Sequence, residues 1–207
     1  MRTVSSHRPR VNPDDSKTGA THMSLTDTEF AVLRATISTR GTVRMALLPI
    51  TILSWAVLAA GVLVLTDTAL AVVFPLAVLV AGFEAIHALH VGVERIGRYI
   101  QVNYESLPGA PQWESTAMRV GPALPGGGID PLFTVVLMAA TFANLIPIAI
   151  VPPPVAQFGV LAALHVLFII RLVRARGAAA RQRAVDLETF KAIKAQAPIP
   201  KPPVPEM

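Results

Sequence analysis

Four long apolar stretches, at about residues 45–65, 69–93, 131–151 and 156–172, constrain the fold of this chain more than any other feature. The hydrocarbon core of a bilayer is about 30 Å thick and takes roughly 20 residues of helix to cross. Because backbone N–H and C=O groups find no water there, each stretch is expected to form a helix. The composition agrees, since 15% of the residues are charged, whereas soluble domains have roughly 25%.

Two short turns join the apolar stretches in pairs. Residues 66–68 separate the first stretch from the second, and the proline run at 152–154 separates the third from the fourth. Asp130 and Pro131 precede the third stretch as a helix cap and a first-turn proline would. The sequence therefore predicts an all-α integral membrane protein with four transmembrane helices. They form two hairpins, over residues 45–93 and 130–172.

The positions of the basic residues predict the orientation. All 18 Lys and Arg residues lie before the first stretch, between the second and third, or from the end of the fourth onward. Because basic residues collect on the cytoplasmic side, both termini and the central segment are expected there. The abundance of Ala, Val and Arg favours a bacterial inner membrane as the location. The pI of about 10.2 is then explained without nucleic acid as a partner.

The segments outside the hairpins differ in composition. The predictions are a disordered polar N-terminus at 1–23 (with Met23 as an alternative start), an amphipathic helix at 24–44, a cytoplasmic helix followed by a Pro/Gly-rich strap at 94–129, a basic cytoplasmic helix at 173–195, and a proline-rich tail at 196–207.

The helix at 24–44 is predicted from a capping box and from its apolar spacing. Thr26 and Glu29 have the spacing of a box in which each side chain caps a backbone amide. Phe30, Leu33 and Ile37 then follow at helical intervals. This pattern is typical of a helix on the membrane surface; a helix docked on the cytoplasmic segment is the alternative.

A polar stripe along the second apolar stretch is the strongest sign of a functional site. At about 100° per residue its members fall within an arc of about 120° on one helix. They are Glu84, His87, His90, Glu94, Arg98, Gln101 and Glu105. Ionisable groups inside a membrane are functional candidates. The intramembrane polar residues are therefore Glu84, His87, Asn144 and His165.

Two interpretations of the stripe involve a cofactor. Glu84 and His87 have the Glu-x-x-His spacing of metal sites in helical bundles, and His90 and Glu94 extend the set toward Zn, Fe or Mn. The other interpretation is haem. His87 and His165 lie at matching distances from the cytoplasmic ends of their helices, so two imidazoles could bind one iron.

Two further interpretations need no cofactor. In the structural interpretation, the stripe residues are paired. Glu84 and the histidines pair across the bundle with Asn144, Thr141 or His165, and Glu94, Arg98 and Glu105 form ion pairs along the helix surface. Alternatively, Glu84 could lie on a path for protons or cations. The sequence favours the structural interpretation.

The predicted function follows from what the sequence lacks as well as from its topology. The chain has no cysteine, which excludes disulfides and thiolate chemistry, and it contains no recognisable catalytic motif. We therefore predict an accessory or scaffolding subunit of a membrane complex, with a protein partner or as a homo-oligomer. The alternatives are a metal- or haem-binding membrane protein and a small proton- or cation-coupled transporter.

Overall fold

The computed structural model describes residues 25–123, 130, 132–150 and 152–196, and this part of the chain is helical without strands. The helices are α1 (Leu25–Leu65), the 3₁₀ helix η2 (Ala69–Val72), α2 (Val73–Asn103), α3 (Trp113–Ala123), α4 (Thr134–Ala143), α5 (Ile146–Ile150) and α6 (Val155–Gln196). The predictions for 1–23, for the end of the strap and for nearly all of the tail lie outside the described residues.

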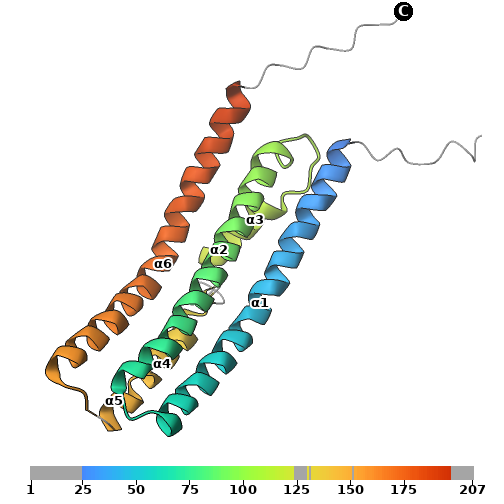
Figure 1. Cartoon of the computed structure of the whole chain (residues 1–207). Coiled ribbons are helices and arrows are strands. Elements are labelled where there is room, and N and C mark those ends of the chain that lie inside the picture. Colours follow the sequence, from blue (N-terminus) through green and yellow to red (C-terminus); the bar gives the residue numbers. More distant parts are fainter. Residues whose placement is uncertain (1–24, 124–129, 131, 151, 197–207) are drawn as a thin grey trace, which may run out of the picture.

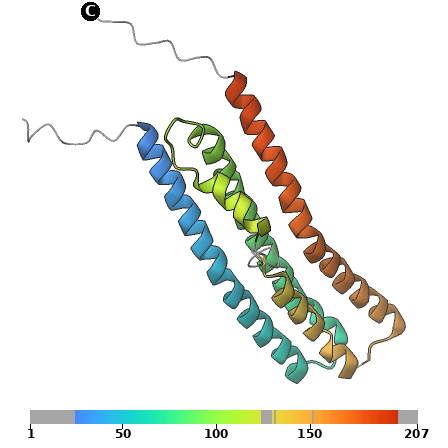
Figure 2. The same cartoon turned by 180° about the vertical axis from the view of Figure 1, so that it is seen from behind.

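The three long helices form one layer, in which α2 lies between α1 and α6 (Figure 1). The shorter helices α3, α4 and α5 form a column against one side of α2, as the reverse view shows (Figure 2). Helix α1 begins and α6 ends at the same end of the molecule (Figure 1). Among the described residues, no helix packs on the opposite face of α2 (Figure 1).

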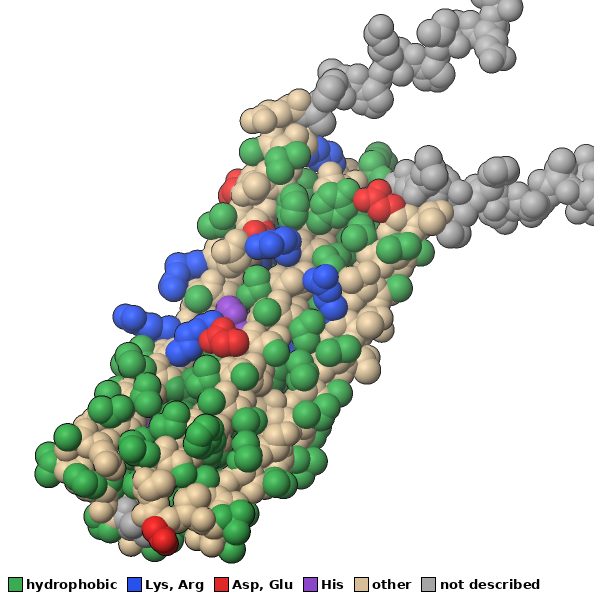
Figure 3. Space-filling view, in the orientation of Figure 1, with side chains coloured by type: hydrophobic (Ala, Val, Ile, Leu, Met, Phe, Trp, Pro, Cys, Tyr) green, Lys and Arg blue, Asp and Glu red, His purple; other side chains and the backbone are tan. Residues whose placement is uncertain are grey.

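Three helices are long and apolar enough to cross a membrane, and they span Asp27–Leu65, Ala69–Asn103 and Val155–Gln196. This confirms the prediction of an all-α protein with membrane-spanning helices. The shorter segment Thr134–Ile150 is also apolar. One half of the molecule is covered by hydrophobic side chains and the other half has most of the charged ones (Figure 3).

Helix α1 is longer than predicted. The sequence indicated a surface helix at 24–44 followed by a separate span from residue 45, whereas the two form one uninterrupted helix. A change from amphipathic to apolar sequence breaks no backbone hydrogen bond, so it does not end a helix. Pro49 lies inside α1 without ending it. The side chain of Thr26 lies outside the described residues, so the capping box stays a prediction.

The third predicted span is not one helix. It divides into α4 and α5, with a turn at Asn144 and Leu145. Pro147 has no N–H to donate to the carbonyl of Ala143, where α4 ends. The start also differs, since α4 begins at Thr134. The Asp130 carboxylate accepts hydrogen bonds from the backbone N–H groups of Leu132 and Thr134, while Pro131 lies outside the described residues.

The strap contains a helix that the sequence did not predict. Helix α3 covers Trp113–Ala123, within the segment interpreted as an irregular Pro/Gly-rich connection. Its cap is supplied by Glu105, whose carboxylate accepts hydrogen bonds from the backbone N–H groups of Glu114 and Ser115. A cap that comes from so far upstream gives no local signal in the sequence.

The apolar core lies between α2, α4 and α6. Leu79, Phe83, Ile86, Leu137 and Leu172 are fully or almost fully buried there. A second cluster near the turn end joins α1, η2, α5 and α6 through Val62, Val72, Ile148 and Leu161. These two clusters pack the helices against one another.

Candidate functional site

The most deeply buried polar residues of the apolar half, among them Asn144 and His165, form one hydrogen-bonded network. Trp55 Nε1 donates to Asn144 Oδ1 over 3.1 Å, and Asn144 Nδ2 lies 3.0 Å from the carbonyl oxygen of Val72. Asn144 Nδ2 also lies 3.1 Å from His165 Nε2, while His165 Nδ1 lies 2.7 Å from the carbonyl oxygen of Leu161. Because that carbonyl can only accept, Nδ1 carries the proton and Nε2 accepts from Asn144.

Glu84 and His87 meet on Arg171, which projects from α6. Arg171 Nη2 lies 2.8 Å from Glu84 Oε2 and 3.4 Å from His87 Nδ1. The Arg171 guanidinium also lies over the ring of Phe83, 5.2 Å from its centroid. The first two members of the polar stripe are therefore brought together, and the group between them is a cation.

The next two members of the stripe have separate partners. His90 Nδ1 accepts a hydrogen bond from Arg44 of α1 over 3.1 Å. Glu94 pairs with Arg183 of α6, 3.3 Å away. The stripe thus faces two different helices, and each of its four metal-ligand candidates lies beside an arginine.

Beyond the apolar half, the stripe continues to α3. Arg98 is 3% exposed and lies 3.6 Å from Glu114, and Arg34 of α1 lies 3.1 Å from the same carboxylate. Burial raises the pKa of Glu114 above its ordinary value, and the two arginines only partly oppose this effect. Gly97 provides the space for this contact, because a Cβ there would lie 2.7 Å from Glu114 Oε2.

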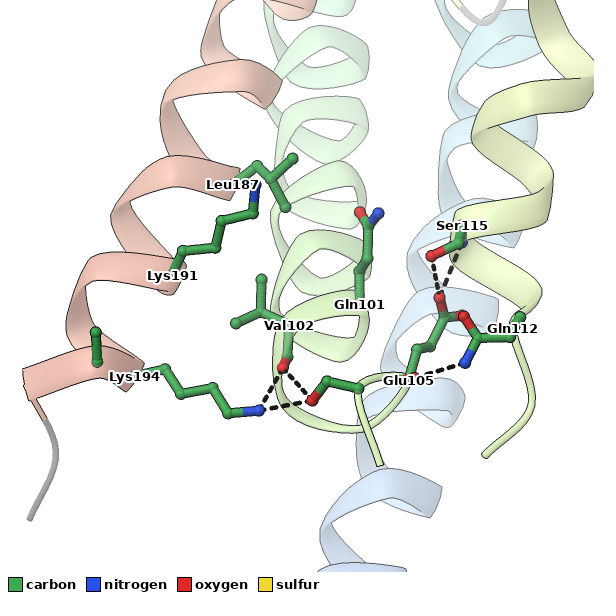
Figure 4. Close-up of a pocket in the computed structure, with 10 residues that line it drawn as sticks. Gln101, Val102, Glu105, Gln112, Ser115, Leu187, Lys191 and Lys194 are labelled. Atoms are coloured by element: carbon green, nitrogen blue, oxygen red, sulfur yellow. Dashed lines mark hydrogen bonds between the residues drawn. The ribbon is translucent and has the colours of Figure 1, made fainter. Parts of the chain in front are cut away.

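A hollow of about 580 Å³ lies between the ends of α2 and α6 and the start of α3 (Figure 4). Lys194 Nζ donates to the carbonyl oxygen of Val102 and to Ser106 Oγ, over 2.7 and 2.6 Å. On the far side, Glu105 accepts hydrogen bonds from Ser115 (Figure 4). The polar groups at this hollow mainly fasten helix ends to one another.

Three buried polar atoms of the stripe region have neither a hydrogen-bond nor an ion-pair partner in the described part of the chain. They are Arg44 Nε, His87 Nε2 and Arg98 Nε. Unsatisfied buried groups of this kind are costly and are often satisfied by ordered water. The region between α1, α2 and α6 is therefore polar enough to hold water.

The geometry gives little support to the cofactor interpretations. Within the described ranges, no three His, Asp or Glu side chains come close enough to hold a metal ion together. The arginines beside Glu84, His87, His90 and Glu94 would repel a cation. His87 and His165 belong to different networks, and both ring nitrogens of His165 are engaged, which leaves none for iron in this arrangement.

Arginine partners for the polar stripe were not predicted from the sequence. Arg44, Arg171 and Arg183 counted only among the basic residues that orient the helices, and Trp55 lies within the first apolar stretch. An available signal was that Arg44 and Arg171 lie at the ends of apolar stretches, where they can reach a carboxylate or imidazole on a neighbouring span. No protein-family model, no curated protein and no solved structure matches this chain.

Proposed function

We propose that this chain is a non-catalytic subunit of a membrane complex, which binds another membrane protein through the face of α2 that α3–α5 leave uncovered. We call this surface the open face. It is made by the exposed residues Phe74, Ala77, Ala81, Ala85 and Ala88. The observation that carries the proposal is an ion pair exposed on this face at bilayer depth.

The open face is shaped for close contact with a helix. Ala77, Ala81, Ala85 and Ala88 repeat at intervals of four, four and three residues, so they form one line along α2. Small side chains let the backbones of membrane helices approach closely. Phe74 is a large side chain at one end of this face, whereas Phe83 and Ile86 of the same helix are buried in the core.

Glu84 and Arg171 lie beside this line of alanines. Their side chains are 45% and 36% exposed. At 1.5 Å per residue, Arg171 is about 24 Å along α6 from Val155, which is within the roughly 30 Å of a hydrocarbon core that begins at the turns. Ionisable groups exposed to lipid at that depth are costly. A protein partner that covers the pair would lower this cost.

The topology is part of the proposal. Helices α1, α2 and α6, together with α4 and α5 as an interrupted fourth span, would form two hairpins with both termini in the cytoplasm. Helix α1 begins and α6 ends at the same end of the molecule (Figure 1), which is the half that has most of the charged side chains (Figure 3), so this arrangement agrees with the positive-inside rule. A bacterial inner membrane remains the expected location.

A photoreactive phospholipid tests the proposal. Its diazirine labels side chains that face lipid, and mass spectrometry then identifies the labelled peptides. In native membranes we expect little label on Ala77–Ala88 and strong label on Val135 of α4, which is 75% exposed on the other side of α2. Val135 is the internal control, because it is lipid-facing whether or not a partner is bound.

The same labelling of purified protein in liposomes identifies the kind of partner. Label that appears on Ala77–Ala88 only after purification indicates a different protein as the partner. Protection in both samples indicates a second copy of this chain. Equal labelling of Ala77–Ala88 and Val135 in native membranes would overturn the proposal.

A second candidate function is proton movement along the polar stripe. It is favoured by the buried His87 Nε2, which has no hydrogen-bond partner among the described residues and could exchange a proton with water. The test is proton flux into liposomes that contain the purified protein. Flux that Glu84→Gln abolishes would support this candidate, and flux no greater than that of empty liposomes would exclude it.

A further inference from the structure

One face of α6 changes from apolar to cationic along its length, on the side that points away from α2. Leu167 and Ile170 are 62% and 43% exposed, and Arg174 and Arg181 follow them as exposed residues. At 100° per residue these four positions fall within an arc of about 60°. Figure 3 shows basic side chains along the outer edge of α6, directly beyond the hydrophobic surface.

Arg174 and Arg181 lie where the headgroups of a bilayer would be. They are about 5 and 15 Å beyond Arg171 along the helix, at 1.5 Å per residue. By the same measure they lie about 29 and 39 Å from Val155. Since the headgroup region adds roughly 5–8 Å beyond a hydrocarbon core of about 30 Å, Arg174 lies at its inner boundary and Arg181 at its outer boundary. A long arginine side chain extends outward from the inner boundary, and one at the outer boundary leans back toward the N-terminus of its helix. Both guanidinium groups can therefore reach phosphate height.

Gly177 lies between the two arginines, one turn before Arg181. A Cβ at Gly177 would lie 3.5 Å from Arg181 Nη1 and would meet no other group, so the Arg181 guanidinium folds back over this glycine in the direction of Arg174. Neither arginine has a carboxylate partner among the described residues, whereas Arg95, Arg171 and Arg183 each have one.

We propose that Arg174, Gly177 and Arg181 bind the phosphate of an anionic phospholipid, whose acyl chains lie against Leu167 and Ile170. Arginine binds phosphate oxygens in a bidentate manner, and basic clusters beside membrane helices bind anionic headgroups. The apolar residues directly below the arginines favour a lipid over a soluble phosphate or an acidic protein. This site does not depend on the open face of α2 or on the function proposed for it.

Native mass spectrometry of the purified full chain tests the site, with phosphatidylglycerol and phosphatidylcholine as probes. We expect the wild type to bind phosphatidylglycerol more tightly. Arg174→Gln and Arg181→Gln should each weaken that binding about five-fold, the effect of roughly one charge near an anionic headgroup. Gly177→Leu, which keeps the charge and fills the space, should also weaken it.

Arg176→Gln is the matched control. Arg176 is also exposed and has no carboxylate partner in the described part of the chain, but it lies about 160° around the helix from Arg174. It should leave the affinity for phosphatidylglycerol unchanged. Equal losses for Arg176→Gln and Arg174→Gln would overturn the site in favour of diffuse charge attraction, as would equal affinities of the wild type for the two lipids.

Two further measurements complete the test. Circular dichroism and gel filtration of each variant should match the wild type, because all the substituted residues are exposed. Inorganic phosphate, added against sulfate of equal ionic strength, should not displace the lipid. Displacement by phosphate alone would assign the site to a soluble anion and overturn the lipid assignment.

Discussion

Arg171 Nη2 lies 2.8 Å from Glu84 Oε2, and this contact joins α6 to α2 where the apolar halves of both helices end. The same guanidinium lies over the ring of Phe83, which is fully buried in the core. One arginine therefore connects the core to the polar stripe. Two further ion pairs between these helices, Arg183 with Glu94 and Arg95 with Asp186, lie farther along.

Replacing Arg171 by leucine should lower the free energy of unfolding by about 1–3 kcal/mol, since Glu84 is left without its partner. The double variant Glu84→Gln/Arg171→Leu should recover part of this loss, because it no longer leaves a charge unpaired. Denaturant titration in mixed micelles measures both. If the losses of unfolding free energy caused by Glu84→Gln and by Arg171→Leu simply add in the double variant, this account is contradicted.

Lys191→Gln breaks an exposed ion pair and provides the comparison for the loss of the Glu84–Arg171 pair. Lys191 lies 2.9 Å from Glu188, and the two side chains are 54% and 73% exposed. An exposed ion pair contributes about 0–1 kcal/mol. The change in unfolding free energy should therefore be clearly smaller than for Arg171→Leu.

Asn144→Leu should destabilise the protein by about 1–2 kcal/mol, the range for hydrogen bonds between membrane helices. The substitution removes the acceptor of the Trp55 N–H and the donor to His165. The fluorescence of Trp55, measured with Trp113→Phe, should shift as well. Thr141→Val is the control, because Thr141 Oγ1 bonds only to the carbonyl of Leu137 in its own helix; it should change both signals less.

Hydrophobicity was enough to predict the long helices, because the cost of unpaired backbone groups in lipid forces each long apolar stretch into a helix. It was not enough to predict their ends. The change at residue 45 is one of side-chain polarity, which leaves the backbone of α1 unaffected. The interruption of the third span follows from the missing N–H of Pro147, which the sequence shows but which many membrane helices tolerate.

The polar stripe was predicted from spacing. The partners expected across the bundle for Glu84, His87 and His90 were Asn144, Thr141 or His165, whereas the structure pairs them with arginines. Periodicity shows which residues share a side of one helix, but it does not show which helix lies opposite. His90 faces Arg44 of α1, while Glu84 and Glu94 face α6. Contacts between residues so far apart in the chain depend on how the helices pack. A single sequence does not encode that packing in any local pattern.

Gly82→Ala should separate α1 from α2. A Cβ at Gly82 would lie 2.2 Å from Thr51 Oγ1, and Thr51 is only 4% exposed, so the added methyl group has no room. Overpacking of this kind typically costs about 1–3 kcal/mol. Unfolding titrations should show that loss, and Thr51→Ala in the same chain should restore most of it.

Gly61→Ala is the matched control on α1, since nothing lies within 4 Å of a Cβ there. Alanine favours helix by up to about 1 kcal/mol over glycine, so this variant should be as stable as the wild type or more stable. A loss equal to that of Gly82→Ala would show that the glycines matter for another reason than the contact with Thr51.

Glu114 should make the stability of the fold depend on pH. Its pKa is raised in the folded protein, chiefly by burial, so the folded state binds the proton more tightly than the unfolded state. The contribution of this carboxyl group to stability is then complete below its unfolded pKa of about 4.5 and is lost as the pH rises through the folded pKa. Glu114→Gln keeps the side chain neutral and should remove this part of the loss.

The experiment compares the unfolding free energies of the wild type and Glu114→Gln at pH values from about 4 to 8, where this linkage acts. Trp113 fluorescence in a Trp55→Phe chain follows the unfolding of α3. As the pH rises, the unfolding free energy of Glu114→Gln should increase relative to that of the wild type. Glu188→Gln is the control, because Glu188 is largely exposed and its difference from the wild type should stay nearly constant. A wild type that gains stability relative to Glu114→Gln at higher pH would show that Arg34 and Arg98 outweigh burial at this carboxylate.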